Sequence, residues 1–330
     1  MSPPAAPEAA DILIIGAGLA GLTAARTLSA RGYRPVILDK GRGVGGRLAT
    51  RRVGDAALDH GAQFFTVRDP AFRALNEAWL AAGVTTEWAE NFPSADGADD
   101  GHREPRYRGV PGMTAPAKAL AAGLDVRTLA KVTALRWRDA GWSVEIEEQP
   151  PLTAAALVLT APAPQSLALL DAGGVALPGE VRTAITRIRY APCLAALAVL
   201  DGPGRVPPPG GLRLSGEPLA WLADNRQKGV SGVSAVTLHA GPEFSRAHFD
   251  GDLAAAGRLM IKAAQPWLGA AVKELHVHRW RYALPEVIHP ERCLAVKAPG
   301  PLVFAGDAFG GPRIEGAVLS GLAAAAPLCA

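Results

Sequence analysis

The sequence of 330 residues contains only three cysteines, Cys193, Cys293 and Cys329. They are odd in number and widely spaced, and none belongs to a CxxC pair. This pattern predicts neither a disulfide framework nor a zinc site, so we expect no bound metal. Unpaired thiols are typical of proteins from a reducing compartment, and we therefore expect a cytoplasmic protein.

Long apolar runs and a strong net charge are also missing. No stretch of about 18 apolar residues occurs, which predicts the absence of a membrane-spanning helix. Residues 1–10 are rich in proline and alanine, without the basic and apolar regions of a signal peptide, and are expected to be a disordered lead-in. The net charge is only +3, from 34 basic and 31 acidic residues, which gives no reason to expect nucleic-acid binding.

What the sequence does contain is enough apolar material for a large core. Hydrophobic residues make up 49% of the chain and charged residues 20%, which fits two domains. Near the N-terminus a strand (11–15), a helix (19–31) and a second strand (36–38) form a strand–helix–strand unit of the parallel type. Shorter strands are predicted beyond it, at 132–137, 142–146, 155–160 and 302–305, with a hairpin turn at Asp139-Ala-Gly141 and a last helix at 316–326.

The middle of the chain, from about residue 164 to 284, changes character. Its strands are longer and alternate in hydrophobicity, at 194–200, 233–240 and 275–282, and helix-like runs occur at 165–170 and 252–265. Alternation of this kind indicates a mixed or antiparallel sheet with one covered face.

The first chemical motif is Gly16-Ala-Gly18-Leu-Ala-Gly21, which directly follows a strand and opens a helix. In this motif Gly16 permits a tight turn, Gly18 lets the backbone approach a pyrophosphate, and Gly21 allows close packing of helix and strand. Asp39 ends the second strand, where an acid holds the ribose hydroxyls of an adenosine. The spacing therefore predicts a dinucleotide site at the N-terminus of the helix.

The second motif runs from Asp39 to Arg47 and is dense in glycine, with Gly46 just before the arginine. Its backbone amides and the Arg47 guanidinium would close over a pyrophosphate from the other side. NAD dehydrogenases do not need this second clamp, so its presence favours FAD over NAD.

The third motif lies near the C-terminus. A strand leads to Gly306 and Asp307, and a helix begins near Glu315, Gly316 and Ala317. Asp307 is placed to accept hydrogen bonds from the ribityl chain, and the helix N-terminus is placed to aim its amides at the flavin ring. With no cysteine or histidine set for flavin attachment, the motifs together predict non-covalent FAD.

Beyond these motifs the sequence resembles renalase and its bacterial relatives, within the flavin amine oxidase superfamily. The runs that carry the resemblance are Leu38-Asp-Lys40, Gly45-Gly-Arg47, Leu58-Asp-His-Gly-Ala-Gln-Phe64, Gly109-Val-Pro-Gly-Met113, Thr160-Ala-Pro162, His278-Arg-Trp280, Gly306-Asp307 and Glu315-Gly-Ala-Val-Leu-Ser-Gly321. The resemblance covers the chain after Asp11. It implies that Gly16, Gly18, Ala20, Asp39, Lys40, Arg47, Gln63, Phe64, Asp307 and Glu315 surround FAD, and that the backbone of Val132 meets the adenine.

The activity implied by the resemblance is oxidation of 2- or 6-dihydro isomers of NAD(P)H. Hydride would pass to flavin N5 and electrons then to oxygen, giving NAD(P)+ and hydrogen peroxide. The alternative is an amine oxidase or another FAD oxidoreductase acting on a reduced carbon–nitrogen bond. A third reading is a flavin-binding protein with an interaction role, which intact phosphate and flavin motifs argue against.

A dihydropyridine needs no base, because its ring nitrogen supplies the electrons as the hydride leaves. The site must hold the ring and exclude water. We therefore assign no catalytic side chain and expect aromatic walls with a few polar groups, from Trp221, Asn225, Arg226, His239, Trp280 and Tyr282. His60 is either a residue near the flavin or a packing residue. An amine oxidase would keep a lysine near the flavin, and the sequence alone does not choose among Lys228, Lys262, Lys273 and Lys297.

The expected fold class is α/β. A doubly wound, Rossmann-like FAD domain of the glutathione-reductase type takes residues 11–70, 120–162 and 290–330. A second domain, with a mixed sheet flanked by helices, takes residues 71–119 and 163–289 and carries the substrate.

Overall fold

The computed structural model describes residues 9–98, 101 and 103–329, which fall into two compact units. The first unit comprises the described part of Met1–Gly46, Ala117–Arg189 and Pro285–Ala330, and the second comprises Arg47–Pro116 and Tyr190–Leu284. Most of the expected lead-in lies outside the described residues. Ala9 and Ala10, however, already belong to the first strand, because they pair with Thr153 and Ala154 in register.

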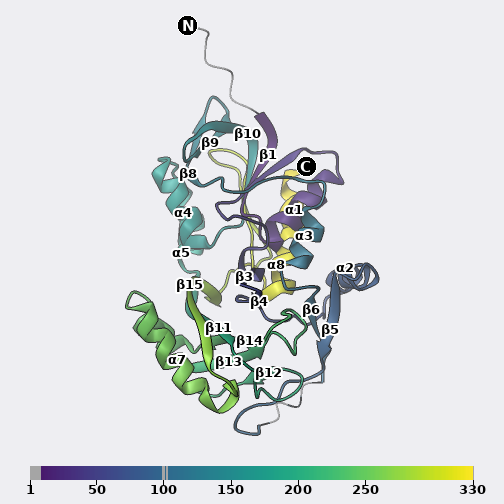
Figure 1. Ribbon diagram of the computed structural model, residues 1–330. Coiled ribbons are helices and arrows are strands. Elements are labelled where there is room, and N and C mark those ends of the chain that lie inside the picture. Colours follow the sequence, from purple (N-terminus) through teal and green to yellow (C-terminus); the bar gives the residue numbers. More distant parts are fainter. Residues whose placement is uncertain (1–8, 99–100, 102, 330) are drawn as a thin grey trace. The chain divides into compact units, whose positions relative to one another are not determined.

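The first unit is built on an eight-stranded sheet (Figure 1). Its main path has the order β16-β17-β10-β1-β2-β7, and β8 and β9 extend it from β10. The strands are β1 (Ala9–Ile15), β2 (Pro35–Leu38), β7 (Asp125–Arg127), β8 (Val132–Arg138), β9 (Gly141–Ile146), β10 (Gln149–Leu159), β16 (Leu294–Val296) and β17 (Leu302–Phe304). The helices are α1 (Leu19–Ser29), α3 (Ala115–Ala121), α4 (Ala163–Ala172), α5 (Gly179–Thr186) and α8 (Arg313–Ala325), with short 3-10 turns at Gly46–Leu48 and Ala326–Leu328.

The central strands of this sheet run parallel. β1 pairs with both β2 and β10, and β10 pairs with β17. The apolar run of β1 is buried on both faces, as expected for a parallel strand between helices. The carboxyl ends of β1, β10 and β17 therefore meet at one edge of the sheet, where the glycine motifs follow. The predicted hairpin between β8 and β9 also forms, with Asp139 and Ala140 at positive φ as a tight two-residue turn requires.

The second unit holds a five-stranded sheet of order β12-β13-β14-β11-β15, and its β11–β14, β12–β13 and β13–β14 pairs are antiparallel. Its strands are β11 (Arg189–Leu200), β12 (Gly211–Arg213), β13 (Leu219–Asp224), β14 (Ala235–Ala240) and β15 (Val272–Val287). Two small hairpins join it, β3 (Thr50–Val53) with β4 (Ala56–Asp59) and β5 (Thr85–Ala89) with β6 (Arg106–Gly109). The helices are α2 (Pro70–Ala81), α6 (Pro242–His248) and α7 (Leu253–Leu268).

The two faces of this sheet differ because side chains alternate along each strand. Leu222 and Leu238 lie on the face that packs against α7, with Met260 in the same apolar cluster (Figure 1). Their neighbours Trp221 and His239 lie on the opposite face, where they are cross-strand partners. One face thus makes the core and the other carries polar and aromatic groups.

The predicted α/β fold class is confirmed, but the division of the chain differs from the sequence-based boundaries. Residues 47–70 belong to the second unit, because Val53, Ala56 and Leu58 share a buried cluster with Leu197 of β11 and Ala235 of β14. Residues 163–189 belong to the first unit, where α4 packs against β8. Both assignments follow from contacts between segments far apart in the sequence. Across the described residues, no helix has the length and apolar character needed to cross a membrane.

Helices α1 and α8 pack closely in the first unit (Figure 1). A Cβ at Gly321 would lie 2.4 Å from the carbonyl oxygen of Ala20 and 2.8 Å from Thr23 Cβ. The glycine is therefore needed to let the two helix backbones approach.

Replacing Gly321 with alanine is expected to push these helices apart and to lower the free energy of unfolding by about 1–3 kcal/mol. Urea unfolding of the purified chain measures this loss. Gly179→Ala is the matched control, because nothing lies within 4 Å of a Cβ there and alanine is expected to be neutral or slightly stabilising. Equal stability of Gly321→Ala and Gly179→Ala would contradict the packing argument.

Candidate functional site

The first glycine loop leaves room for a phosphate at one position and none at two others. Gly16 has a φ of +115°, and a Cβ there would lie 2.6 Å from Thr160 Oγ1. A Cβ on Gly21 would lie 2.0 Å from the oxygen of Gly16, so both positions require glycine. At Gly18 an added Cβ would meet nothing within 4 Å, and α1 begins there without a side-chain cap. The first amides of α1 are thus available to an anion beside Gly18.

Asp39 organises the turn around this loop. One carboxylate oxygen accepts a hydrogen bond from the Ala17 amide and the other from the Gly41 amide, each at 2.7 Å. Because a carboxylate offers about four acceptor sites, Asp39 keeps capacity for ribose hydroxyls. The side chain of Lys40 is exposed, and Ala20 is buried in α1, where its carbonyl oxygen lies beside Gly321 of α8.

The second glycine loop lies against the first. The Gly45 amide donates to the oxygen of Ala17 at 2.8 Å, and a Cβ at Gly46 would lie 3.8 Å from Gly18 Cα. Two backbone loops therefore border the same position, and that they clamp a pyrophosphate together with Arg47 stays a prediction. Arg47 belongs to the second unit, where its guanidinium donates to the carbonyl oxygens of Tyr282 and Ala283 at 3.2 and 3.4 Å.

The C-terminal motif reaches the same edge of the sheet. Gly306, with φ +136°, follows β17, and its amide donates to Ser320 Oγ at 2.8 Å. A Cβ there would lie 3.6 Å from the oxygen of Thr160, the residue whose hydroxyl borders Gly16. Asp307 is buried, and Glu315 lies in the first turn of α8, where the helix dipole favours a negative charge. Gly316 is fixed by packing, because a Cβ would lie 1.9 Å from the oxygen of Gly311, whereas Ala317 and Val132 are half-buried.

These features fit the phosphate and adenosine parts of FAD. The open position at Gly18, the uncapped N-terminus of α1 and the half-buried carboxylate of Asp39 are the donor and acceptor set that a dinucleotide requires. The structure therefore brings together Gly16, Gly18, Gly21, Asp39, Gly46 and Gly306.

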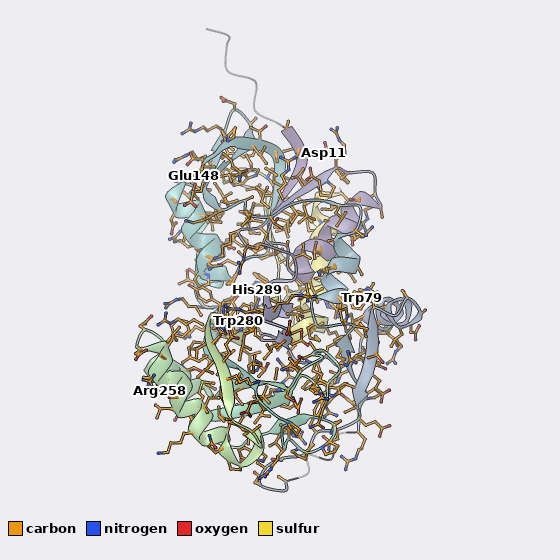
Figure 2. All side chains as sticks on the ribbon, in the orientation of Figure 1. Asp11, Trp79, Glu148, Arg258, Trp280 and His289 are labelled. Carbon is orange, nitrogen blue, oxygen red and sulfur yellow. The ribbon has the colours of Figure 1, made fainter. Side chains whose placement is uncertain are left out.

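The second unit presents a polar–aromatic face, which we define as Trp221, His239, His278 and Trp280. The segment 59–64 crosses this face. The backbone oxygen of His60 accepts from His239 Nε2 at 3.2 Å and from Trp280 Nε1 at 2.9 Å, and Figure 2 labels Trp280 on β15. The His60 ring packs against both His278, at 4.9 Å, and Trp280, at 5.2 Å, which contact each other at 4.3 Å.

A buried ion pair anchors segment 59–64. Lys228 Nζ lies 2.8 Å from Asp59 Oδ2, and both side chains are fully buried. Asp59 Oδ1 accepts from Thr50 Oγ1 at 2.5 Å and from the Met113 amide at 2.9 Å. Burial lowers the pKa of Lys228, while the adjacent Asp59 carboxylate opposes that shift. The sequence alone left Lys228 as one of four lysines, because nothing local distinguishes a lysine 169 residues away from its partner.

Hydrogen bonds to the same network also fix the Gln63 side chain. Its amide nitrogen donates to the oxygens of Asp59 and Gly61, at 2.7 and 3.1 Å, and its amide oxygen accepts from Lys228 at 3.3 Å. The Gln63 side chain therefore shapes the loop. Phe64 enters an aromatic cluster with Trp88, Phe92 and Trp221.

The remaining sequence candidates fall into two groups. Asn225 is buried and structural, since Oδ1 accepts from the Asp59 amide and Nδ2 donates to Thr237 Oγ1. Arg226 is exposed, and Tyr282 packs edge-on against Tyr190 at 5.4 Å. Among the residues that the structure describes, neither side chain is seen to bond to segment 59–64.

The histidines of this region are neutral at physiological pH. Burial, with the neighbouring His278 and Arg51, lowers the pKa of His60 to about 4. Burial also lowers the pKa of His239 to about 4, and that of His278 from its usual value. These imidazoles are suited to hydrogen bonding without charge.

We expect Asp39→Ala to weaken FAD retention by about 1.5–3 kcal/mol, because the ribose hydroxyls and two backbone amides lose a charged acceptor. The flavin-to-protein absorbance ratio after dialysis measures this, with Asp55→Ala, an exposed acid in the β3–β4 turn, as control. Full flavin occupancy in Asp39→Ala would show that the carboxylate only ends a strand.

We expect Lys228→Met to cost about 3–5 kcal/mol of folding free energy, because it leaves the Asp59 carboxylate buried without its counter-ion. The double variant Asp59→Asn/Lys228→Met is expected to recover much of this loss, since no unpaired charge remains. Urea unfolding compares these variants with Lys262→Met, an exposed lysine of α7. A Lys228→Met protein as stable as the Lys262→Met control would contradict the ion-pair argument.

Comparison with known proteins identifies the families that this chain matches. Residues 14–78 match the NAD(P)-binding Rossmann-like domain, and residues 94–329 match the family described as flavin containing amine oxidoreductase. Similar curated proteins include a hydroxyneurosporene desaturase of Rubrivivax gelatinosus, 37% identical over 76 residues. Another is the putative flavin-containing monoamine oxidase AofH of Mycobacterium tuberculosis, 38% identical over 69 residues. These matches cover 23% and 21% of this chain, and only 14% and 15% of the relatives' own lengths.

Solved structures are similar over nearly the whole chain. A double mutant of putrescine oxidase redesigned in its cofactor binding superposes with a TM-score of 0.70 at 16% identity, covering 97% of this chain and 99% of that one. Cyclohexylamine oxidase from Brevibacterium oxydans gives 0.68 at 14% identity, covering 97% and 98%. At these identities the likeness shows the fold alone. The family match spans most of the chain, and with the glycine loops and Asp39 it shows that this protein is an FAD-dependent oxidoreductase belonging to the flavin-containing amine oxidoreductase family.

Proposed function

We propose that this enzyme is a renalase-like oxidase of the 2- or 6-dihydro isomers of NAD(P)H, with FAD bound non-covalently. Its products would be NAD(P)+ and, after electron transfer to oxygen, hydrogen peroxide. The proposal combines the sequence resemblance with the chemistry of the polar–aromatic face.

The observation that carries the proposal is the charge balance of the second unit. Among the described residues of this unit, the two buried carboxylates are already engaged, Asp59 by Lys228 and Asp224 by the amides of Arg226 and Gln227. His60 and His239 are neutral above about pH 5, because burial lowers the pKa of each to about 4. A face of neutral rings suits the neutral dihydropyridine ring of such a substrate, which releases hydride without help from a base.

The residues of this face would bind and orient such a substrate. Trp221 and Trp280 offer flat apolar surfaces for a dihydropyridine ring, and His239 and Trp280 hold segment 59–64 in place through the His60 oxygen. When bound, FAD supplies the hydride acceptor and the route of electrons to oxygen. Neutral histidines also avoid repelling the pyridinium ring, which gains a positive charge as hydride leaves.

Non-covalent binding is supported by the state of the cysteines. Burial raises the pKa of the Cys193 thiol to about 12 and that of Cys293 above its usual value, so neither forms a reactive thiolate at neutral pH. The glycine loops and Asp39 offer the contacts that hold a dinucleotide without a bond.

Amine oxidation is the second candidate. It is favoured by the fold likeness to putrescine oxidase and cyclohexylamine oxidase and by the fully buried Lys228. An amine must lose a proton before it is oxidised, so the two candidates differ in their dependence on pH.

We expect borohydride-reduced NAD, which contains the dihydro isomers, to bleach the flavin under anaerobic conditions. Because His60 and His239 stay neutral, the reduction rate is expected to vary less than about threefold from pH 6 to 9 and to fall only as the pH approaches 4. Stopped-flow absorbance measures the rate at each pH.

Putrescine and cyclohexylamine serve as comparison substrates in the same experiment. Bleaching by either amine, with a rate that climbs about tenfold or more over this range, would support the amine oxidase instead. A comparable climb with the isomers would show that a base takes part.

A further inference from the structure

Several polar groups on the polar–aromatic face and in segment 59–64 are already paired within the protein. The amide of Gln63 is used at both ends, by two backbone oxygens and by Lys228. Asn225 is used at both ends as well, and the ring nitrogens of His239 and Trp280 that reach segment 59–64 meet the His60 oxygen. These groups have little capacity left for a ligand.

Two buried ring nitrogens remain unsatisfied, one on this face and one in segment 59–64. His60 Nδ1 and Trp221 Nε1 are buried without a hydrogen-bond partner among the described residues. A buried polar atom of this kind is costly and rare in native proteins, and it commonly marks a position that a water or a ligand completes. Both belong to rings that are more than nine-tenths buried, with 6% of His60 and 8% of Trp221 still exposed.

The two rings are placed on the same side of the sheet. Trp221 is the cross-strand partner of His239, and His239 contacts the backbone of His60. A ligand that spans His239 therefore meets a donor at Trp221 and a neutral imidazole at His60. Trp221 donates only, so it needs an acceptor such as a carbonyl oxygen, whereas neutral His60 can accept from an N–H or O–H group.

The charges around His60 further limit the chemical class of the ligand. The groups that face His60 are His278 and Trp280 on β15, His239 on β14, Arg51 on β3, and Asp59, which is paired with Lys228. A cationic amine would meet Arg51 and find the Asp59 carboxylate already engaged. A carboxylate would be attracted by Arg51, but it has no hydrogen to donate and would leave His60 Nδ1 without a partner.

We propose that His60 and Trp221 are substrate-binding residues. They recognise a neutral carboxamide carried on an aromatic or dihydropyridine ring, together with neighbouring hydroxyl groups of the substrate. This rests on the proposed function, because such a group is what distinguishes a nicotinamide from a simple amine. Both residues bind the substrate, and neither transfers the proton or the hydride.

The test uses the flavin-loaded full chain and three small probes of similar shape: benzamide, benzoate and benzylamine. Binding is followed by the change in flavin absorbance. The variants are His60→Phe and Trp221→Phe, which keep an aromatic ring and remove the unsatisfied nitrogen. Their matched controls are His276→Phe, a partly exposed histidine of β15 beside Glu274, and Trp88→Phe, whose indole already donates to the oxygen of Pro209.

We expect wild-type protein to bind benzamide more tightly than benzoate or benzylamine. Each variant is expected to lose about three- to tenfold in benzamide affinity, the range of one hydrogen bond, while both controls keep theirs. Thermal stability of the variants is expected to be equal to or above wild type, because each removes an unsatisfied buried atom. His60→Asn, whose amide occupies the place of Nδ1, is expected to restore benzamide binding and serves if His60→Phe does not fold.

Unchanged benzamide affinity in both variants, an equal loss in the controls, a preference for benzylamine, or no benzamide binding to wild type would each overturn the inference. The proposed function is judged separately by flavin bleaching with the dihydro isomers. Bleaching with unaltered benzamide binding in the variants would leave the function standing and the inference wrong. Weaker benzamide binding in the variants, without bleaching by the dihydro isomers, would show a carboxamide site in an enzyme with another substrate.

Discussion

The buried contact between Asp59 and Lys228 is the constraint on which the second unit depends. Asp59 alone touches three separate segments, since its side chain meets Thr50, Met113 and Lys228 and its amide donates to Asn225, which lies in the same loop as Lys228. A carboxylate buried at 0% exposure is tolerated only with such a set of partners. The position of every residue from 59 to 64 then follows. Gln63 is oriented by the same lysine, and the His60 oxygen faces the two rings that donate to it.

The packing around Asp59 also explains two glycines, Gly61 and Gly112, for which the sequence alone gives no reason. A Cβ at Gly112 would lie 2.7 Å from Thr50 Oγ1 and 3.1 Å from Asp59 Oδ1, and one at Gly61 would lie 1.9 Å from the oxygen of Arg47. These residues stand in runs that carry the family resemblance. Gly112 lets the backbone approach Thr50 and the Asp59 carboxylate, and Gly61 lets backbone approach backbone, as Gly16 and Gly21 do in the first unit.

Sequence reasoning reached the first unit well and the second poorly. The strand–glycine–helix pattern at residues 11–31 is local, so its physics is readable from neighbouring residues, and the same holds for the Asp139–Gly141 hairpin. The membership of β3 and β4 in the second unit depends on Leu197 and Ala235, which are more than a hundred residues away. The choice of Lys228 over three other lysines, and the internal use of both ends of Asn225, depend on similar distances. No local pattern records which buried polar group will find a partner.

Pairing of this kind has a chemical consequence. When the charged groups beneath a binding face pair with one another, the face carries little net charge although it is built from histidine, lysine and aspartate. Burial keeps His60 and His239 uncharged, with a pKa of about 4 for each, so the rings neither attract an anion nor repel a forming cation. A substrate that turns from neutral to cationic during its reaction is better served by such a face than by a fixed charge, which would favour one state over the other. Recognition then falls to the few ring nitrogens without partners, and an enzyme of this design selects its substrate by hydrogen bonds and shape before any redox step takes place.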